Sequence, residues 1–494
     1  MPSAPHPDQQ ARLETDPSEF IADLGRIVGA RHVTRDADDM APWLTDWRGR
    51  YNGRALAMAA PADTGELASV VRHCARHGVP IITQGGNSGM VGGATPDSSG
   101  KQLLLSTRRM TRLEIDRGAK TAVCGAGVVL QNLHEAAEAE GLRFPLSLGG
   151  KGSATVGGLV STNAGGTQVL RHGTMRALIL GLQVVLPDGR VLETGAGLRK
   201  DNRGFDLKQL FIGSEGTLGI VTQATLSLVS AICERQTAWV GATTLANARH
   251  LLLHCEERLG PALEGFEVLP QICLDHVAAY LPDARPPLRQ RHAWHALIEC
   301  VDDGRLADGA LRAQVESCLS DALDTGLAGD AALASSEAQA EAFWALRENI
   351  APAEKAQGPA VQHDIAVAPE AMPDMVERLT RAIEDRFPGH EVRAFGHLGD
   401  GNIHFHVAAP SDYSPDWSTT LAPAISAFVY DTVAQGGGTI SAEHGIGQDK
   451  LATLARTHDP AALDLMRAVK SALDPAGLLN PGRLVPLAPG AANP

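Results

Sequence analysis

The stretch SLGGKGSATVGGLVSTNAGG, residues 147–166, is the most informative part of the sequence, because it contains seven glycines within twenty residues. An earlier stretch, QGGNSGMVGGATP (84–96), contains five more. A loop needs several glycines where its backbone adopts positive φ or approaches a ligand closely. Successive backbone N–H groups in such loops form nests that bind anions such as a pyrophosphate. Structural turns are the alternative for either cluster, but two clusters with interleaved Ser, Thr and Asn favour a large anionic cofactor.

The order of elements around these clusters excludes the common nucleotide motifs. A short buried strand at 79–83 runs directly into the first cluster, and both clusters are expected to be loops beside short strands. Neither cluster gives GxGxxG followed at once by a helix, and the chain contains no GxxxxGK[ST] motif. A nicotinamide or nucleoside triphosphate site is therefore disfavoured.

Strands and helices alternate on both sides of the clusters. Asp63 and Glu66 form a capping box for a helix that ends at Gly78. The sequence LGLQVVLPDGRVLET (180–194) predicts a hairpin with a Pro-Asp-Gly turn. From about residue 231 the chain becomes Ala-rich and helical, so we place a domain boundary there. Further elements are expected as strands at 102–106, 121–124, 295–301 and 361–368, and as helices at 129–140 and 463–473.

Length, charge and cysteine usage limit the function classes. A chain of 494 residues exceeds a single ordinary core. The net charge of −14 argues against nucleic acid or an anionic membrane as the main partner. The seven cysteines show no metal or disulfide spacing, which is typical of reduced thiols in an intracellular protein. The polar start carries no secretory signal, and no apolar run is long enough for a transmembrane helix. We expect a cytoplasmic location.

Histidines gather in the last third of the chain, within GHLGDGNIHFH (396–406) and SAEHGIG (441–447). His397 and His404 can converge across a turn made by glycines and Asp400, and His404 shares a strand face with His406. Glu443 adds a carboxylate from a separate loop. Two imidazoles and a carboxylate make a sound first shell for Zn²⁺ or Mn²⁺, with positions left open for a substrate.

The order of QGGNSGM, LGGKGSATVGGLVSTNAGG, LGLQVVLPDG and FIGSEGTLGIVT closely resembles the FAD domain of the vanillyl-alcohol-oxidase-type (PCMH-type) flavoproteins. Within that superfamily the chain resembles the D-lactate, glycolate and D-2-hydroxyglutarate dehydrogenase branch. The resemblance implies an α+β fold, with a PCMH-type FAD-binding domain of two α/β subdomains, an α+β substrate (cap) domain and a C-terminal helical return. The implied divisions are a lead at 1–40, the FAD domain at 41–230, the cap at 231–440 and the return at 441–494.

The resemblance also implies roles for individual residues. It gives His397, His404 and Glu443 as metal ligands and His444 as the catalytic base. FAD is expected to be non-covalent, because Asn87 and Ser88 stand in the loop where some relatives carry a flavin-linked His. The implied cofactor-binding residues are Gln84, Gly85, Gly86, Asn87, Ser88, Gly89, Met90, Gly152, Ser153, Thr155, Gly158, Ser161, Asn163, Gly165, Gly219, Ile220 and Asn480.

Arg347 lies in EAFWALRENI (341–350), which reads as a helix with Phe343, Leu346 and Ile350 inward. From the pattern alone, Arg347 is either an arginine whose stem lies on that face or one that grips a substrate carboxylate. The resemblance (WxLRExI) implies the second role.

The chain differs from the glutarate-type relatives at three positions, and in those relatives the residues at these positions help to hold the second carboxylate of the substrate. This chain has Ala351 at the position where such relatives carry a Thr, and His406 at the position of their Asn. Gln362 lies near the position of their Lys. Gln362, His406 and His444 are the other expected substrate contacts, and His363 or His406, if protonated, could partly replace the missing groups.

The sequence therefore predicts an FAD- and metal-dependent dehydrogenase that oxidises a D-2-hydroxy acid to the 2-oxo acid. D-2-hydroxyglutarate is the first substrate candidate, and D-lactate, glycolate or another monocarboxylate is the second. A flavin-free metal hydrolase is the alternative from another class. Electron-transferring flavoprotein, a cytochrome or a quinone would suit as electron acceptor, and a homodimer is possible by analogy.

Overall fold

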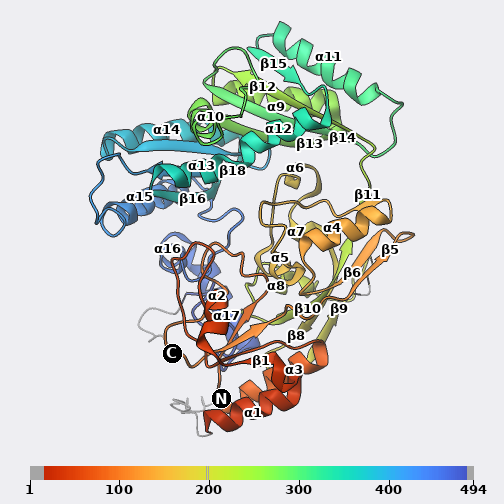
Figure 1. The fold of residues 1–494 in the computed structure, drawn as a ribbon, viewed down its shortest axis with the longest axis vertical. Helices are drawn as coiled ribbons and strands as arrows, with labels where there is room; N and C mark the ends of the chain where they lie inside the picture. The colour runs from red at the N-terminus through yellow and green to blue at the C-terminus, as the bar shows by residue number, and fades with distance from the viewer. Residues whose placement is uncertain (1–15, 196, 199, 487–494) are drawn as a thin grey trace.

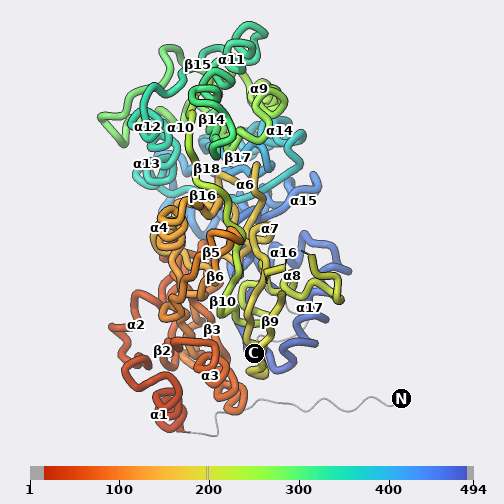
Figure 2. The backbone as a smooth tube through the Cα atoms, turned by 90° about the vertical axis from the view of Figure 1, so that its right-hand side faces the viewer, coloured from red at the N-terminus to blue at the C-terminus, as the bar shows by residue number. Residues whose placement is uncertain are grey.

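The computed structural model describes residues 16–486 except 196 and 199, so the first fifteen residues and the tail APGAANP lie outside the described part. The chain forms an elongated molecule with one lobe at each end (Figures 1 and 2). The described residues up to about 230 make the lower lobe of Figure 1, and the segment from β12 to α15 makes the upper one. The mixture of helices and sheets confirms the predicted α+β class.

The first layer of the lower lobe is a four-stranded sheet in the order β1-β2-β4-β3. Helix α1 packs on it through Phe20 and Leu24, which are fully buried, so residues that we had assigned to a lead belong to this core. Asp63 caps α3 and Gly78 ends it in the left-handed conformation, as the sequence predicts. The elements are α1 (Pro17–Val28), β1 (Val33–Thr34), α2 (Ala37–Leu44), β2 (Ala57–Ala59), α3 (Thr64–His77), β3 (Ile81–Gln84) and β4 (Leu103–Ser106).

The second layer is an antiparallel sheet in the order β5-β6-β10-β8-β9. β8 and β9 form the predicted hairpin, and Gly189 takes the positive φ of its turn. β5 was not expected from the sequence. The elements are β5 (Leu113–Asp116), β6 (Thr121–Gly125), α4 (Leu130–Ala139), β7 (Leu142–Arg143), α6 (Val169–His172), α7 (Met175–Leu178), β8 (Ile179–Val185), β9 (Val191–Thr194), α8 (Lys208–Phe211), β10 (Ile220–Ser227) and β11 (Val229–Ser230).

The second glycine cluster is not a loop throughout, which corrects the expectation from sequence. A helix, α5 (Val156–Thr162), begins directly after Thr155 and ends at Asn163 in the left-handed conformation. Gly157 lies inside α5 because a Cβ there would come within 2.7 Å of the Ala126 side chain. Gly157 therefore allows α5 to pack closely against the end of β6.

The upper lobe is a seven-stranded antiparallel sheet in the order β15-β12-β14-β13-β17-β18-β16. Helices α9, α11, α14 and α15 cover one face, and α10, α12 and α13 cover one end of the other. The strands are β12 (Glu234–Ala242), β13 (Leu263–Pro270), β14 (Trp294–Asp302), β15 (Asp330–Leu333), β16 (Ala360–Ala366), β17 (Glu391–His397) and β18 (Asn402–Ala408). The helices are α9 (Leu245–Leu259), α10 (Gln271–Tyr280), α11 (Ala310–Asp324), α12 (Glu337–Glu348), α13 (Ile350–Gln357), α14 (Met372–Arg386) and α15 (Leu421–Gln435).

The end of the chain returns to the lower lobe through α16 (Leu451–Thr457) and α17 (Pro460–Leu473). Leu479 forms a bridge to Ile81 at the start of β3, and the Lys470 ammonium donates to the Thr217 carbonyl at 2.7 Å. The helix expected over 463–473 thus begins earlier and ends where predicted, at Asp474. No helix within the described ranges is long and apolar enough to cross a membrane.

Candidate active site

The β17–β18 hairpin carries the clustered histidines. Its turn, Leu398–Gly401, contains Gly401 at φ 80°, where a Cβ would come within 1.9 Å of the Val367 carbonyl oxygen. The turn places His397 at the end of β17 opposite Asn402 and lets its ring face His404, with the centroids 5.6 Å apart. The predicted convergence of the two histidines is confirmed.

Strand alternation decides which side chains share the polar face of this sheet. Asp364 on β16 pairs with His404 on β18, and Phe395 on β17 pairs with His404 from the other side. His406 lies two residues further along the same face, with its ring centroid 6.3 Å from that of His404. The polar groups therefore meet where the helices leave this face of the sheet uncovered.

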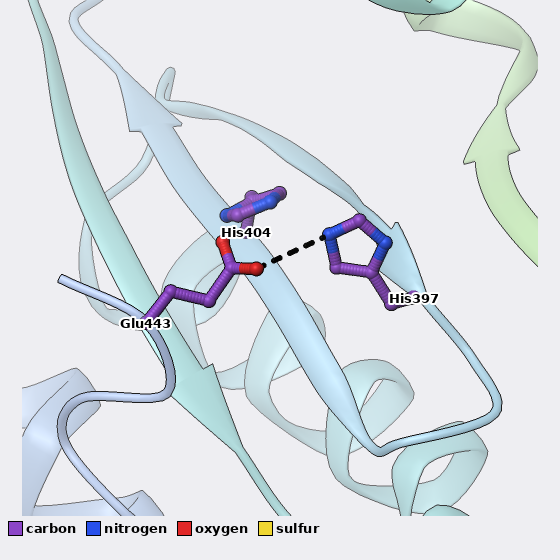
Figure 3. Close-up of side chains that lie close together, drawn as sticks. All are labelled: His397, His404 and Glu443. Atoms are coloured by element: carbon purple, nitrogen blue, oxygen red, sulfur yellow. Dashed lines mark ion pairs between the residues drawn. The ribbon is translucent and has the colours of Figure 1, made fainter. Parts of the chain in front are cut away.

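Glu443 reaches the two histidines from a separate loop (Figure 3). Its Oε1 lies 3.8 Å from His397 Nε2, and one donor atom from each of His397, His404 and Glu443 fits within a 4.8 Å span. Burial, assisted by the charges of Asp364 and Asp400, raises the pKa of Glu443 to about 7, although the charge of His397 opposes the shift. An accumulation of carboxylates beside two imidazoles is an environment that a divalent cation would stabilise.

Two buried carboxylates hold the loop that carries Glu443. The backbone N–H groups of Glu443 and His444 donate to Asp364 Oδ2 at 2.9 and 2.8 Å. Those of Ile446 and Gly447 donate to the two oxygens of Glu215 at 2.7 and 2.8 Å. Since Asp364 belongs to the upper lobe and Glu215 to the lower one, the loop is fastened to both.

His444 lies beside the candidate metal ligands, stacked on His404 with ring centroids 6.4 Å apart. Its Nδ1 is 3.6 Å from Asp364 Oδ2, which leaves Nε2 for another partner. Burial lowers the pKa of His444 to about 4, although Asp364 opposes the shift. The ring is therefore neutral near pH 7 and can accept a proton. Asp364, Glu443 and His444 form a second group whose donor atoms lie within 4.8 Å.

Glu267 on β13 connects Arg347 to this cluster. Its Oε2 accepts from Arg347 Nε at 2.7 Å, and its Oε1 contacts His397 Nδ1, which fixes the ring so that Nε2 faces Glu443. Burial would lower the pKa of His397, but the Glu267 charge and hydrogen bond raise it to about 9. Arg347 also stacks over the Phe395 ring at 5.0 Å. Its terminal nitrogens point to no partner among the described hydrogen bonds.

The helix that carries Arg347 is shorter than expected, because α12 ends at Glu348 and α13 begins at Ile350. Phe343, Leu346 and Ile350 are buried as predicted.

Gln362 and His406 both contact the buried carboxylate of Glu354, which was not identified from the sequence. Glu354, only 2% exposed, accepts from Gln362 Nε2 at 3.1 Å and contacts His406 Nδ1 at 2.7 Å through the same Oε2. Arg393 approaches the other oxygen at 3.5 Å. His363, in contrast, faces the opposite side of the sheet, where burial lowers its pKa to about 3. His363 therefore cannot replace a substrate-binding cation.

The two glycine clusters pack directly against each other. A Cβ on Gly85 would come within 2.2 Å of Thr155 Oγ1, and one on Gly86 within 1.7 Å of the Ser153 carbonyl oxygen. Gly165 lies beside Glu443, since a Cβ there would be 3.3 Å from Oε1. The second cluster thus runs from the first glycine loop to the candidate metal ligands.

These loops also keep groups available for a ligand. The space beside Gly89, Gly149 and Gly152 is open, with no atom within 4 Å of an added Cβ. Gln84 Oε1 and Thr155 Oγ1 are buried, and neither has a hydrogen-bond partner within the described ranges. Open backbone next to unsatisfied polar atoms fits a cofactor rich in phosphate oxygens and ring nitrogens.

Several other residues that are predicted to bind the cofactor also stabilise the fold, and their role toward the cofactor stays a prediction. Asn87 donates to the carbonyls of the α2 end, and Asn163 accepts from the Arg176 backbone. Asn480 accepts from the Thr83 N–H and donates to the Glu215 carbonyl. Gly219 is enclosed by interior side chains and Ile220 is 1% exposed. The remaining residues, Ser88, Met90, Gly158 and Ser161, are partly exposed along the two clusters.

Comparison with known proteins agrees with this geometry. Residues 55–195 match the FAD binding domain model, and residues 233–484 match the model of FAD linked oxidases, C-terminal domain. Among solved structures, p-cresol methylhydroxylase superposes with a TM-score of 0.74 at 16% identity, covering 95% of this chain and 96% of the other. Alkyldihydroxyacetonephosphate synthase superposes with a TM-score of 0.70 at 17% identity, covering 96% and 88%. The fold is that of an FAD-linked oxidase of the PCMH type.

Relatives that align with nearly the whole of this chain identify its family more specifically. The mitochondrial D-2-hydroxyglutarate dehydrogenase of Bos taurus is 37% identical over 97% of this chain and 86% of its own length. The D-2-hydroxyglutarate dehydrogenase of Xanthomonas citri pv. viticola is 33% identical over 95% of this chain and 97% of its own. The chain therefore belongs to the FAD-linked D-2-hydroxy-acid dehydrogenase family.

Proposed function

We propose that the protein oxidises a D-2-hydroxy acid to the 2-oxo acid with FAD and a divalent metal ion held by His397, His404 and Glu443. The observation that carries the proposal is the meeting of this ligand set with the end of the second glycine cluster at Gly165. A flavin and a metal bound in these two places would lie side by side. The match to the FAD binding domain model argues against the flavin-free hydrolase.

Each group at the site has a separate role in alcohol oxidation. When bound, FAD supplies the hydride acceptor and the cation supplies Lewis acidity toward the hydroxyl group. His444, neutral and oriented by Asp364, accepts the hydroxyl proton at Nε2. Arg347, anchored by Glu267, offers its terminal nitrogens to a substrate carboxylate. The Glu267 carboxylate holds the His397 ring in a single orientation.

Two classes of substrate are candidates, and a separate observation supports each. The names of the relatives favour D-2-hydroxyglutarate. The buried Glu354 favours D-lactate, glycolate or another monocarboxylate, because it accepts from Gln362 Nε2 and contacts His406 Nδ1, two groups that could otherwise bind a second substrate carboxylate. A carboxylate brought near Glu354 would also be repelled by it.

A substrate and metal screen tests the proposal. Purified protein should show a yellow flavin spectrum and reduce an artificial electron acceptor with D-2-hydroxyglutarate or D-lactate. Treatment with a chelator should abolish turnover while the flavin stays bound, and Zn²⁺ or Mn²⁺ should restore it. A preference for L-acids, or full activity after complete metal removal, would overturn the proposal. The ratio of kcat/KM for the two D-acids decides between the substrates.

A further inference from the structure

A cationic cavity lies away from the candidate active site, at the junction of the two lobes. Its volume is about 200 Å³, and it is bordered by Lys120, Arg143, Arg171, His172 and Arg305. These residues come from the β5–β6 turn, β7, α6 and the loop after β14. The linker strand β11 forms another part of its wall.

One buried carboxylate, Glu264 at the start of β13, contacts several of these cationic side chains. It is 1% exposed and contacts Arg143 through both oxygens, with Arg171 Nη1 at 2.8 Å and His172 Nε2 at 3.4 Å. Burial would raise the pKa of Glu264, but His172 and Arg143 outweigh it and hold the pKa well below its usual range. Glu264 therefore carries a full negative charge and neutralises one of the two arginines.

The cavity retains an excess of positive charge after that pairing. Four permanent cations, Lys120, Arg143, Arg171 and Arg305, face two carboxylates, Glu264 and Asp303, which leaves an excess of two positive charges. Among the residues that the structure describes, Lys120 donates to a hydroxyl, Ser230 Oγ, at 2.8 Å and to no carboxylate. The Nε of Arg143 is buried and has no hydrogen-bond partner in that part of the chain. In a chain with a net charge of −14, such a local excess indicates a site for an anion.

We propose that this cavity binds a phosphate group, either as inorganic phosphate or as a small phosphate monoester. Guanidinium and ammonium groups arrive from separate segments, which suits a tetrahedral oxyanion that can accept from several directions. A phosphate dianion would also match the excess of two positive charges. The site differs from the FAD and substrate sites proposed above, and the proposal does not depend on the reaction.

The position of α6 connects this cavity with the candidate active site. Arg171 and His172 border the cavity, while the preceding Leu170 packs on Gly399 in the turn between His397 and His404. Val169 lies 3.2 Å from the Cβ position of Gly165, next to Glu443. An anion held by α6 would therefore stabilise the helix that abuts both the metal-ligand turn and the glycine cluster.

Calorimetric titration of the FAD- and metal-loaded enzyme tests the proposal without turnover. Inorganic phosphate and glycerol 3-phosphate are each titrated, with ionic strength held constant by NaCl. The wild type should bind one equivalent saturably and melt at a higher temperature when phosphate is present. The tighter of the two probes identifies the source of the phosphate group. An absence of saturable binding would overturn the proposal.

A double variant, Lys120→Ala with Arg305→Ala, locates the site. Neither side chain contacts Glu264, so the buried cluster stays intact. We expect Kd to rise at least about tenfold, since two cations are lost. Arg203→Ala is the matched control, because Arg203 and Arg305 are 78% and 77% exposed and each pairs with an aspartate two residues earlier. Equal binding by the wild type and the double variant would overturn the proposal.

Discussion

The two faces of the sheet formed by β16, β17 and β18 differ by a single residue step along each strand. On one face, His363 donates from Nδ1 to the Phe405 carbonyl, contacts Ser426 Oγ through Nε2 and lies within the core under α15. On the other face, the next residue, Asp364, holds the loop that carries His444. Neighbours in sequence are thus a neutral structural histidine and an ionised functional carboxylate. This difference shows that strand register, rather than residue type, determines which face of the sheet each side chain joins.

The largest effect on activity is expected from the functional face, at His444. Replacing His444 with Ala removes the proton acceptor and should lower kcat by about 10²–10⁴-fold, which is the usual contribution of general base catalysis. FAD absorbance and bound metal should be unchanged. The matched variant is His363→Gln, on the core face, which should change kcat far less. Wild-type turnover by His444→Ala would show that the base is misassigned.

A smaller effect is expected from Glu267→Gln, which weakens the orientation of His397 without removing a ligand. Metal affinity should fall by about 10–100-fold, as for other carboxylates that orient a ligating histidine. Activity measured against added Zn²⁺ or Mn²⁺ should show a raised half-saturation concentration.

Glu264→Gln supplies the control for Glu267→Gln, since Glu264 is an equally buried, arginine-paired glutamate three residues earlier on β13. Its metal dependence should match that of the wild type. If the two variants behave alike, Glu267 acts through the fold and not through His397.

Local patterns predict much of the fold and the histidine cluster. Capping at Asp63, the turn at Gly189 and the spacing of His397 and His404 depend on residues close in sequence, so their geometry follows from the chain itself. The helix α5 was missed because its glycines are typical of a loop, whereas close packing against Ala126 requires one of them, Gly157.

The carboxylates Glu215, Glu267, Glu354 and Asp364 were not identified as site residues, because most of their partners lie far away in sequence. Glu267 and His397 are 130 residues apart, and Glu215 and Ile446 are 231 apart. A single glutamate on a strand carries no signal of such a partner. Only two features pointed to them: Asp364 stands near the family's Lys position, and Glu267 lies between the apolar residues Phe266 and Val268 on β13.

The smallest effect on activity is expected from the core face, at Leu379 on α14. Its side chain is fully buried in the cluster that contains Ile365, Phe405 and Ile425. Leu379→Ala should destabilise the protein by about 2–5 kcal/mol through lost burial and a residual cavity. A lowered melting temperature with kcat within about twofold of the wild type would show that the helix-covered face supplies stability while the opposite face supplies chemistry. A loss of kcat comparable to that of Glu267→Gln, measured where the variant is still folded, would mean that packing under the sheet sets the geometry of the ligands above it.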